Sequence, residues 1–258
     1  MLRLIDTHAH LDEIEDLSEA LREAADAGVV AVIAVGTGYG SNDKILEISQ
    51  KYKGFVYPAL GLHPWQLAHM GPAEAERTLH QIEDNIGVAV AVGEIGLDYD
   101  KRVKSLASKE RQKAVLAELM KLARKYHKPA IIHDRYAWQD ALTIALEAGI
   151  RDAVFHWYTG PSSILRDMVT QGYFISATPA SEYHTEHRRA VKEAPLSRLL
   201  LETDAPVAYG RENKYTSRPR DVLRTLRAAA EVKGIDEVHL AEQTTQNALR
   251  LFAICVSI

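Results

Sequence analysis

Histidine and carboxylate residues recur in short motifs of this sequence, at a spacing that suits metal binding. In Asp6-Thr-His-Ala-His10, two histidines stand two positions apart. Residues i and i+2 of an extended segment point the same way, so His8 and His10 could reach one ion from a strand end. Asp6 would then be a supporting partner of that site. Taken alone, the pair could equally be two surface histidines.

Four further candidate ligands each stand at the end of an apolar segment: Glu94, His133, His156 and Asp204. Together the motifs supply four imidazoles and two carboxylates, which exceeds the three protein ligands of a typical mononuclear catalytic zinc site. The surplus predicts two divalent ions that share a carboxylate, a geometry suited to displacement at phosphorus or attack on a carbonyl carbon. Imidazole ligands favour zinc, manganese or other first-row metals. Magnesium is less natural among so many histidines, although carboxylates and substrate oxygens could help hold it.

His63 lies in Gly61-Leu-His-Pro64, which reads as a rigid turn at a strand end. An imidazole titrates near neutrality, so His63 is a candidate for contact with a substrate phosphate or for proton transfer. The alternative is a histidine that only hydrogen-bonds its own loop. The other six histidines are expected to be surface or structural residues, although a loop could bring two of them, His184 and His187, near the site.

The elements that must position these residues alternate along the whole chain. Eight apolar strand candidates lie at about 2–5, 29–35, 55–60, 88–92, 130–132, 152–155, 173–176 and 199–201. Helical spacing of apolar residues occurs at about 17–25, 41–52, 108–127, 137–148, 161–170, 182–194, 219–233 and 236–252. This α/β alternation predicts a parallel sheet, and eight units favour a closed (β/α)8 TIM barrel over a doubly wound open sheet.

Every candidate ligand falls at or just after a predicted strand. Active sites of (β/α)8 barrels are built at the C-terminal ends of the strands, so we expect the metal site on that face. The 258 residues, 47% apolar and 26% charged, suit one such barrel of roughly 250 residues. No Pro/Gly/Ser linker divides the chain, and residues 1–258 are therefore predicted to form a single domain.

Composition also limits where and how the protein works. Cys255 is the only cysteine, which excludes a disulfide framework and suggests a reducing compartment. No apolar run reaches the roughly 18 residues that span a bilayer, and charge interrupts the N-terminus too early for a signal peptide. We therefore expect a cytoplasmic protein without membrane contact. The sequence does not determine the oligomeric state, and a monomer is favoured over an oligomer. The net charge of -4 argues against a grip on nucleic acid by the whole surface but leaves room for a local basic rim.

Six motifs, in order, resemble those of the TatD family of metal-dependent hydrolases: Asp6-Thr-His-Ala-His, Gly61-Leu-His-Pro, Gly93-Glu-Ile-Gly-Leu-Asp, Ile132-His, Phe155-His-Trp-Tyr-Thr-Gly and Leu201-Glu-Thr-Asp-Ala-Pro. The segment from Thr245 to Phe252 is similar to the C-terminal signature of the family, so the resemblance covers essentially the whole chain. It implies a TIM-barrel deoxyribonuclease that depends on metal ions, and several members are described as 3′–5′ exonucleases.

Carried over motif by motif, the resemblance implies a role for each ligand. His8, His10 and Asp204 would hold the first ion. Glu94 would bridge the two ions, and His133 and His156 would hold the second, with His63 near the scissile phosphate: a complete ligand set.

The sequence departs from the family pattern at the substrate rim. Asp134 stands before Arg135 where a small residue is common, and Trp157-Tyr158 follows His156 in place of Cys-Phe. Ser217-Arg218-Pro219 occupies the place of a segment similar to Asn-Glu-Pro.

The expected reaction is hydrolysis of a DNA phosphodiester, with Asp204 or His63 taking a proton from the attacking water. Arg135 and either Arg218 or Arg220 are candidate phosphate contacts, because a guanidinium binds two oxygens at once. Trp157, with Trp65 and Tyr158, could stack a base of single-stranded or frayed DNA. Solvated charges and ordinary packing are the alternatives for these residues.

Two other functions stay open. The same metal pair would serve an amidase, a deacylase or a lactonase, because the ligands do not distinguish phosphorus from carbon. A barrel that binds metal or nucleic acid without catalysis is the third reading, and the complete ligand set argues against it.

Overall fold

The computed structural model describes residues 2–256, and its centre is a sheet of eight parallel strands in sequential order. They are β1 (Leu4–Ala9), β2 (Val29–Val35), β3 (Val56–Leu62), β4 (Ala91–Gly96), β5 (Ala130–His133), β6 (Ala153–Phe155), β7 (Phe174–Ala177) and β8 (Leu199–Leu201). The two edges meet just after β8, where Ala9 bridges Ala205 and the His10 N–H donates to the Ala205 carbonyl at 2.7 Å. The fold is the predicted (β/α)8 barrel.

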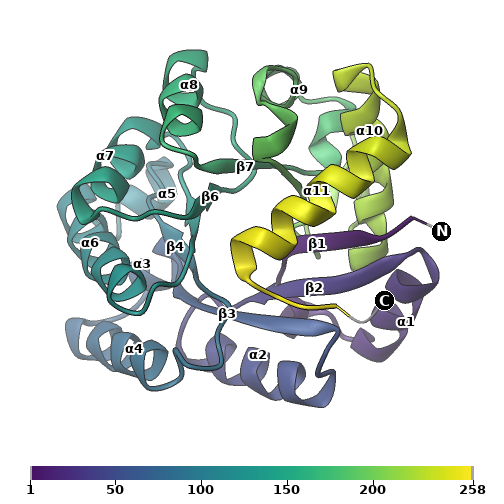
Figure 1. Cartoon of the computed structure of the whole chain (residues 1–258). Helices are drawn as coiled ribbons and strands as arrows, with labels where there is room; N and C mark the ends of the chain where they lie inside the picture. The colour runs from purple at the N-terminus through teal and green to yellow at the C-terminus, as the bar shows by residue number, and fades with distance from the viewer. Residues whose placement is uncertain (1, 257–258) are drawn as a thin grey trace.

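The inside of the barrel is a packed apolar core. Side chains from all eight strands fill it, and they are fully or almost fully buried: Ile5, Ala31, Ile33, Val35, Ala59, Ala91, Ile131, Val154, Phe174 and Leu200. Leu251 and Phe252 of the last helix, α11 (Glu237–Phe252), join this cluster and close the N-terminal end of the barrel (Figure 1). The candidate site residues lie at the opposite end, where the strands finish.

Helices surround the barrel and pack their apolar stripes on its outer side. In chain order they are α1 (Leu17–Asp26), α2 (Tyr39–Lys51), α3 (Pro64–Ala68), α4 (Pro72–Asp84), α5 (Lys101–Lys104), α6 (Lys109–Lys125), α7 (Trp138–Ala148), α8 (Ser162–Thr170), α9 (Thr185–Glu193), α10 (Val222–Lys233) and α11. Residues 2–256 also contain four single-turn 3-10 helices and one hairpin: η1 (Leu11–Glu13), η2 (Pro179–Glu182), η3 (Leu196–Arg198), η4 (Pro219–Asp221), and β9 (Ala208–Tyr209) paired with β10 (Tyr215–Thr216).

Two strands differ from the sequence prediction in a way that matters for the site. β1 continues to Ala9, so that His8 lies inside the strand and not beyond it. β4 begins at Ala91 rather than 88 and includes Glu94. Glycine next to Glu94 allows β3 and β4 to pair closely at this point. A Cβ on Gly61 of β3 would lie only 2.2 Å from the Glu94 carbonyl oxygen. Because the two backbones approach so closely, the glycine-rich segment around Glu94 belongs to β4 and not to the loop after it.

No helix within residues 2–256 combines the length and the apolar character that crossing a membrane requires.

Candidate metal centre

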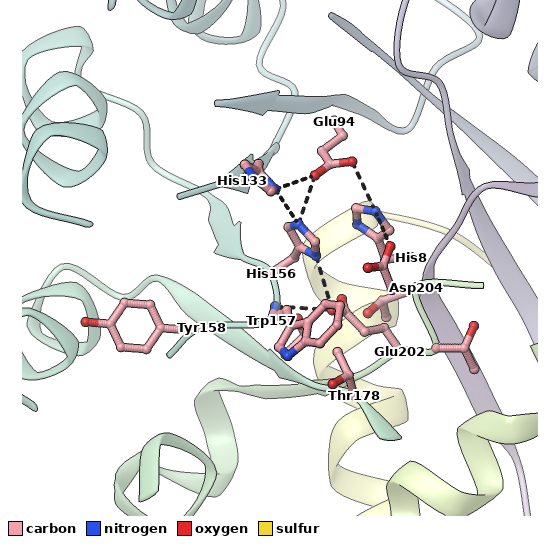
Figure 2. A network of polar contacts seen from close by, with 12 residues as sticks. His8, Glu94, His133, His156, Trp157, Tyr158, Thr178, Glu202 and Asp204 are labelled. Atoms are coloured by element: carbon pink, nitrogen blue, oxygen red, sulfur yellow. Dashed lines mark hydrogen bonds and ion pairs between the residues drawn. The ribbon is translucent and has the colours of Figure 1, made fainter. Parts of the chain in front are cut away.

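The six predicted ligands converge at the C-terminal end of the barrel, although they come from five different strands or the segments that follow them: His8 and His10, Glu94, His133, His156 and Asp204. Figure 2 shows His8, Glu94, His133 and His156 turned toward one another, with Asp204 beside His8. Their donor atoms fall into two groups that meet at Glu94.

The first group consists of the Nε2 atoms of His8 and His10, Oδ1 of Asp204 and Oε2 of Glu94. The two Nε2 atoms are 3.4 Å apart, and Asp204 Oδ1 lies 3.5 and 3.2 Å from them. Glu94 Oε2 is 3.4 and 3.6 Å from the same two nitrogens. Metal–ligand bonds of about 2.0–2.1 Å in a tetrahedron place the donors roughly 3.3 Å apart, so these atoms fit one ion.

The second group surrounds the other oxygen of Glu94. Oε1 lies 2.9 Å from His156 Nε2 and 3.0 Å from His133 Nδ1, and these two nitrogens are 3.3 Å apart. The two oxygens of Glu94 therefore face different sets of donors. A bridging carboxylate requires this arrangement.

Burial and charge make the cluster a favourable place for positive charge. Burial raises the pKa of Glu94, but the surrounding histidines outweigh it and hold that pKa well below its usual range. Burial lowers the pKa of His10, yet the hydrogen bond and charge of Asp204 raise it to about 9. Without an ion the cluster would therefore bind protons, and a divalent cation would take their place.

The backbone at Asp204 is held in an unusual conformation. Its φ of 49° lies in the left-handed region, which non-glycine residues adopt at a cost. The preceding Thr203 is fixed by Asp6, whose carboxylate accepts from the Thr203 N–H at 2.9 Å and from its hydroxyl at 2.6 Å. Asp6 thus supports the site through the chain next to Asp204, and not through a histidine ring.

Two carboxylates that the sequence did not single out contact two of the candidate imidazoles on the side away from Glu94. Asp98 Oδ2 is 3.2 Å from Nε2 of His133, and Glu202 Oε1 is 3.3 Å from Nδ1 of His156. In each ring the remaining nitrogen faces Glu94. Asp98 belongs to the motif around Glu94, and Glu202 to the motif around Asp204. Membership of these motifs is the only sign in the sequence that the two carboxylates belong to the site. Such partners fix the tautomer and orientation of a metal-binding histidine.

His63 joins the second group but presents a proton to it. Its Nδ1 accepts a hydrogen bond from the Trp65 N–H at 3.1 Å, so a neutral ring carries its hydrogen on Nε2. That Nε2 lies 3.4 Å from Oε1 of Glu94. Burial lowers the pKa of His63. In this tautomer His63 is a hydrogen-bond donor and not a metal ligand.

A cavity of about 690 Å³ opens over the donor groups. Arg135 and Trp157, two of the predicted substrate contacts, line it, and so do Trp65 and His184. Arg135 is held by Asp98, with its Nη2 3.0 Å from Oδ2. His184, expected to be a structural histidine, both lines the cavity and caps α9 through its Nδ1. His187 is a satisfied structural residue as expected, buried between the Thr178 N–H and the Tyr158 carbonyl.

Arg218 does not line this cavity, contrary to the expectation of a phosphate contact. Its guanidinium lies against α1, where it pairs with Asp16 and, at 3.0 Å, with Glu23. Arg220 also pairs with Glu23, at 2.8 Å. Tyr158 is not a stacking platform either, because its ring is buried, its hydroxyl donates to the Pro161 carbonyl, and it points away from the ligands (Figure 2).

The whole chain is similar to known proteins of one family. The family model described as "TatD related DNase" matches residues 5–253. The chain is 35% identical to the deoxyribonuclease TATDN3 of Homo sapiens, over 96% of this chain and 94% of the relative. It is 32% identical to the metal-dependent hydrolase YabD of Bacillus subtilis, over 97% and 99%.

Solved structures agree in fold. The crystal structure of the TatD homologue YjjV from Escherichia coli superposes with a TM-score of 0.89 at 30% identity, covering 98% of this chain and 99% of the other. An N-acetyl-D-glucosamine-6-phosphate deacetylase from Mycobacterium smegmatis, at 13% identity and a TM-score of 0.64, shares the fold alone. A match over nearly every residue, together with this level of identity, shows that the chain belongs to the TatD family of metal-dependent hydrolases.

Proposed function

We propose that this protein hydrolyses phosphodiester bonds of DNA with two divalent ions, and that residues 1–258 form one catalytic domain. The observation that carries the proposal is the position of Glu94. Its Oε2 faces His8 and His10, whereas its Oε1 faces His133 and His156. Two donor groups that share a carboxylate, and that could each hold one cation, suit in-line displacement at phosphorus.

Each donor group would hold one ion. His8, His10 and Asp204 with one oxygen of Glu94 form the first site, and His133 and His156 with the other oxygen form the second. When bound, the ions would neutralise charge on the phosphate oxygens and make water acidic enough to act near neutral pH. The four imidazoles favour zinc or manganese over magnesium.

Side chains around the ions would handle protons and the phosphate. Burial raises the pKa of Asp204, but the histidine contacts, with His10 first, outweigh this and lower it, so Asp204 is ionised and can accept the proton of the attacking water. His63 offers its Nε2–H to a phosphate oxygen or to the leaving oxygen. Arg135, partly exposed at the rim, can bind a neighbouring phosphate.

DNA is the proposed substrate because a relative 35% identical over 96% of this chain is named a deoxyribonuclease. A cavity of about 690 Å³ is in the size range of small-ligand clefts, so it suits a strand end better than a length of duplex. We therefore propose exonuclease action, in the 3′–5′ direction that the family resemblance implies, with Trp157 on the rim as a surface for a base.

The proposal is tested with protein stripped of metal and reloaded separately with zinc, manganese or magnesium. Substrates are end-labelled single- and double-stranded DNA, RNA, N-acyl amides and lactones. We expect cleavage of DNA with release of nucleotides from the 3′ end. Cleavage of the amides or lactones with every nucleic acid left intact would assign the protein to the carbon-centred alternative.

A Glu94→Gln variant tests the shared carboxylate. It should lose activity and the binding of both ions, measured as bound metal per chain after gel filtration. Glu47→Gln, on the exposed side of α2, is the matched control and should keep both. A Glu94→Gln protein that still holds two ions would remove the bridging role.

A further inference from the structure

A strongly basic surface lies beside the pocket in an otherwise acidic protein. Residues 101–113 contain six lysines and arginines and one acidic residue, whereas the chain as a whole has a net charge of -4. We call the exposed members on α5 and at the start of α6, namely Lys101, Arg102, Lys104 and Lys109, the basic ridge.

Most of the charge of the ridge is available to a ligand. Arg102 pairs with Asp100 at 3.0 Å. Within the described residues, no carboxylate lies within 4.0 Å of the side-chain nitrogens of Lys101, Lys104 and Lys109; Lys109 instead lies over the Tyr99 ring at 4.1 Å. Three ammonium groups are thus left to attract an anion from solvent.

An aromatic residue connects the basic ridge to the metal centre. Trp65 lines the cavity, and the guanidinium carbons of Arg102 and Arg135 lie 5.2 and 5.9 Å from the centre of its ring. The indole N–H donates to Asp98 Oδ2 at 3.0 Å, and that oxygen is 3.2 Å from His133. Contacts between side chains therefore run continuously from His133 through Asp98 and Trp65 to the basic ridge.

The opposite side of the mouth has the opposite charge. Residues 12–19 contain five aspartates and glutamates and no lysine or arginine, and Glu13 lines the cavity. Asp16 pairs with Arg218 and Glu19 with Arg22, which leaves Asp12, Glu13 and Glu15 as the source of the negative charge. Figure 1 shows α1 and α5 on opposite sides of the barrel. A polyanion engaged at the metal centre is therefore repelled by the acidic residues before α1 and attracted toward α5.

We propose that single-stranded DNA leaves the pocket across Trp65 and follows the basic ridge, with phosphates at Lys101, Lys104 and Lys109 and a base against the indole. Proteins hold single strands without sequence preference by this combination of cations and aromatic rings. The inference rests on the proposed function. It adds that strands long enough to reach α5 are preferred over short ones.

The test compares two substrates. One is a 12-nucleotide oligothymidylate, and the other is bis(p-nitrophenyl) phosphate, which is too small to reach the ridge. The combined Lys101→Ala, Lys104→Ala and Lys109→Ala variant of the metal-loaded enzyme is measured beside a control that combines Lys51→Ala, Lys53→Ala and Lys192→Ala. The control residues are exposed lysines elsewhere on the surface.

We expect the ridge variant to lose about tenfold in kcat/KM on the oligonucleotide, chiefly through KM, with hydrolysis of the small diester unchanged. The slope of log kcat/KM against log salt should fall by about 2, since each phosphate contact on a single strand contributes roughly 0.7. The control should match the wild type.

If the ridge variant and the control have equal kcat/KM and equal salt dependence on the oligonucleotide, the proposed role of the basic ridge is wrong and the proposed function stands. A wild-type enzyme that cleaves no nucleic acid at all would instead overturn the proposed function.

Discussion

Asp98 and His133 are joined on the side of the imidazole that faces away from Glu94, with 3.2 Å between Oδ2 and Nε2. His133 can therefore turn its Nδ1 toward the donor group and keep its hydrogen on the other nitrogen. We expect Asp98→Asn to weaken metal binding at the second site about 10- to 100-fold while the first site is retained. Zinc titration against a competing chelator measures this. Asp152→Asn, an exposed change, is the control, and equal affinities in the two variants would contradict the role.

His63 should act on the reaction and not on the binding of metal. Its Nδ1 is occupied by the Trp65 N–H, which leaves Nε2 as a donor. We expect His63→Ala to lower kcat by about 10²–10⁴-fold with two ions still bound per chain. His133→Ala, measured in parallel, should lose both activity and an ion. Loss of an ion in His63→Ala would place this histidine among the ligands.

Gly61 should tolerate no larger residue, because a Cβ there would lie 2.2 Å from the Glu94 carbonyl oxygen. We expect Gly61→Ala to lower the free energy of unfolding by about 1–3 kcal/mol, as overpacking does, and to displace Glu94 and reduce metal binding. Gly40→Ala, within α2 and with no atom within 4 Å of the added carbon, should be neutral or stabilising. Urea unfolding distinguishes the two, and equal stability would show that β3 and β4 can move apart.

The buried imidazole of His187 should make the protein less stable in acid. Burial lowers its pKa to about 4, below the ordinary value of 6.5, so folding favours the neutral ring. The stabilisation is present above pH 6.5 and is lost as the pH falls from 6.5 to 4, at most about 3 kcal/mol. We expect the unfolding free energy of the wild type to fall more steeply over this window than that of His187→Gln. His239→Gln, an exposed change on α11, should keep the wild-type slope. Parallel curves for wild type and His187→Gln would contradict the assignment.

The order of the strands and the face that carries the site could be read from the sequence. β2 and β8 lie at the predicted residues, because continuous apolar runs leave few alternatives for a buried strand. The six candidate ligands could be named for a related reason. Polar residues that directly follow buried strands have only one end of a barrel to occupy.

Contacts between distant parts of the chain could not be predicted. The sequence predicts the fourth strand at 88–92, whereas β4 spans Ala91–Gly96. The difference arises because the end of β4 pairs with β3 through the close approach of Gly61. The ion pairs of Arg218 with Asp16 and Glu23 leave no local trace in the sequence, so the sequence offers Arg218 as a phosphate contact. The helices α3, α4 and α5 were also missing from the predicted set. Asp98 and Glu202 stood inside recognised motifs, but their partners became visible only with the rings in place.

The first donor group lies across the seam of the barrel. His8 lies in β1, His10 follows that strand, and Asp204 follows β8; backbone bonds between these segments close the cylinder. An ion held there would act as a cross-link between the beginning and the end of the barrel. It could be captured only after the eighth unit has folded, and its removal would take one link away from this seam, whose backbone bonds remain. Tight binding of the first metal would therefore report that assembly is complete.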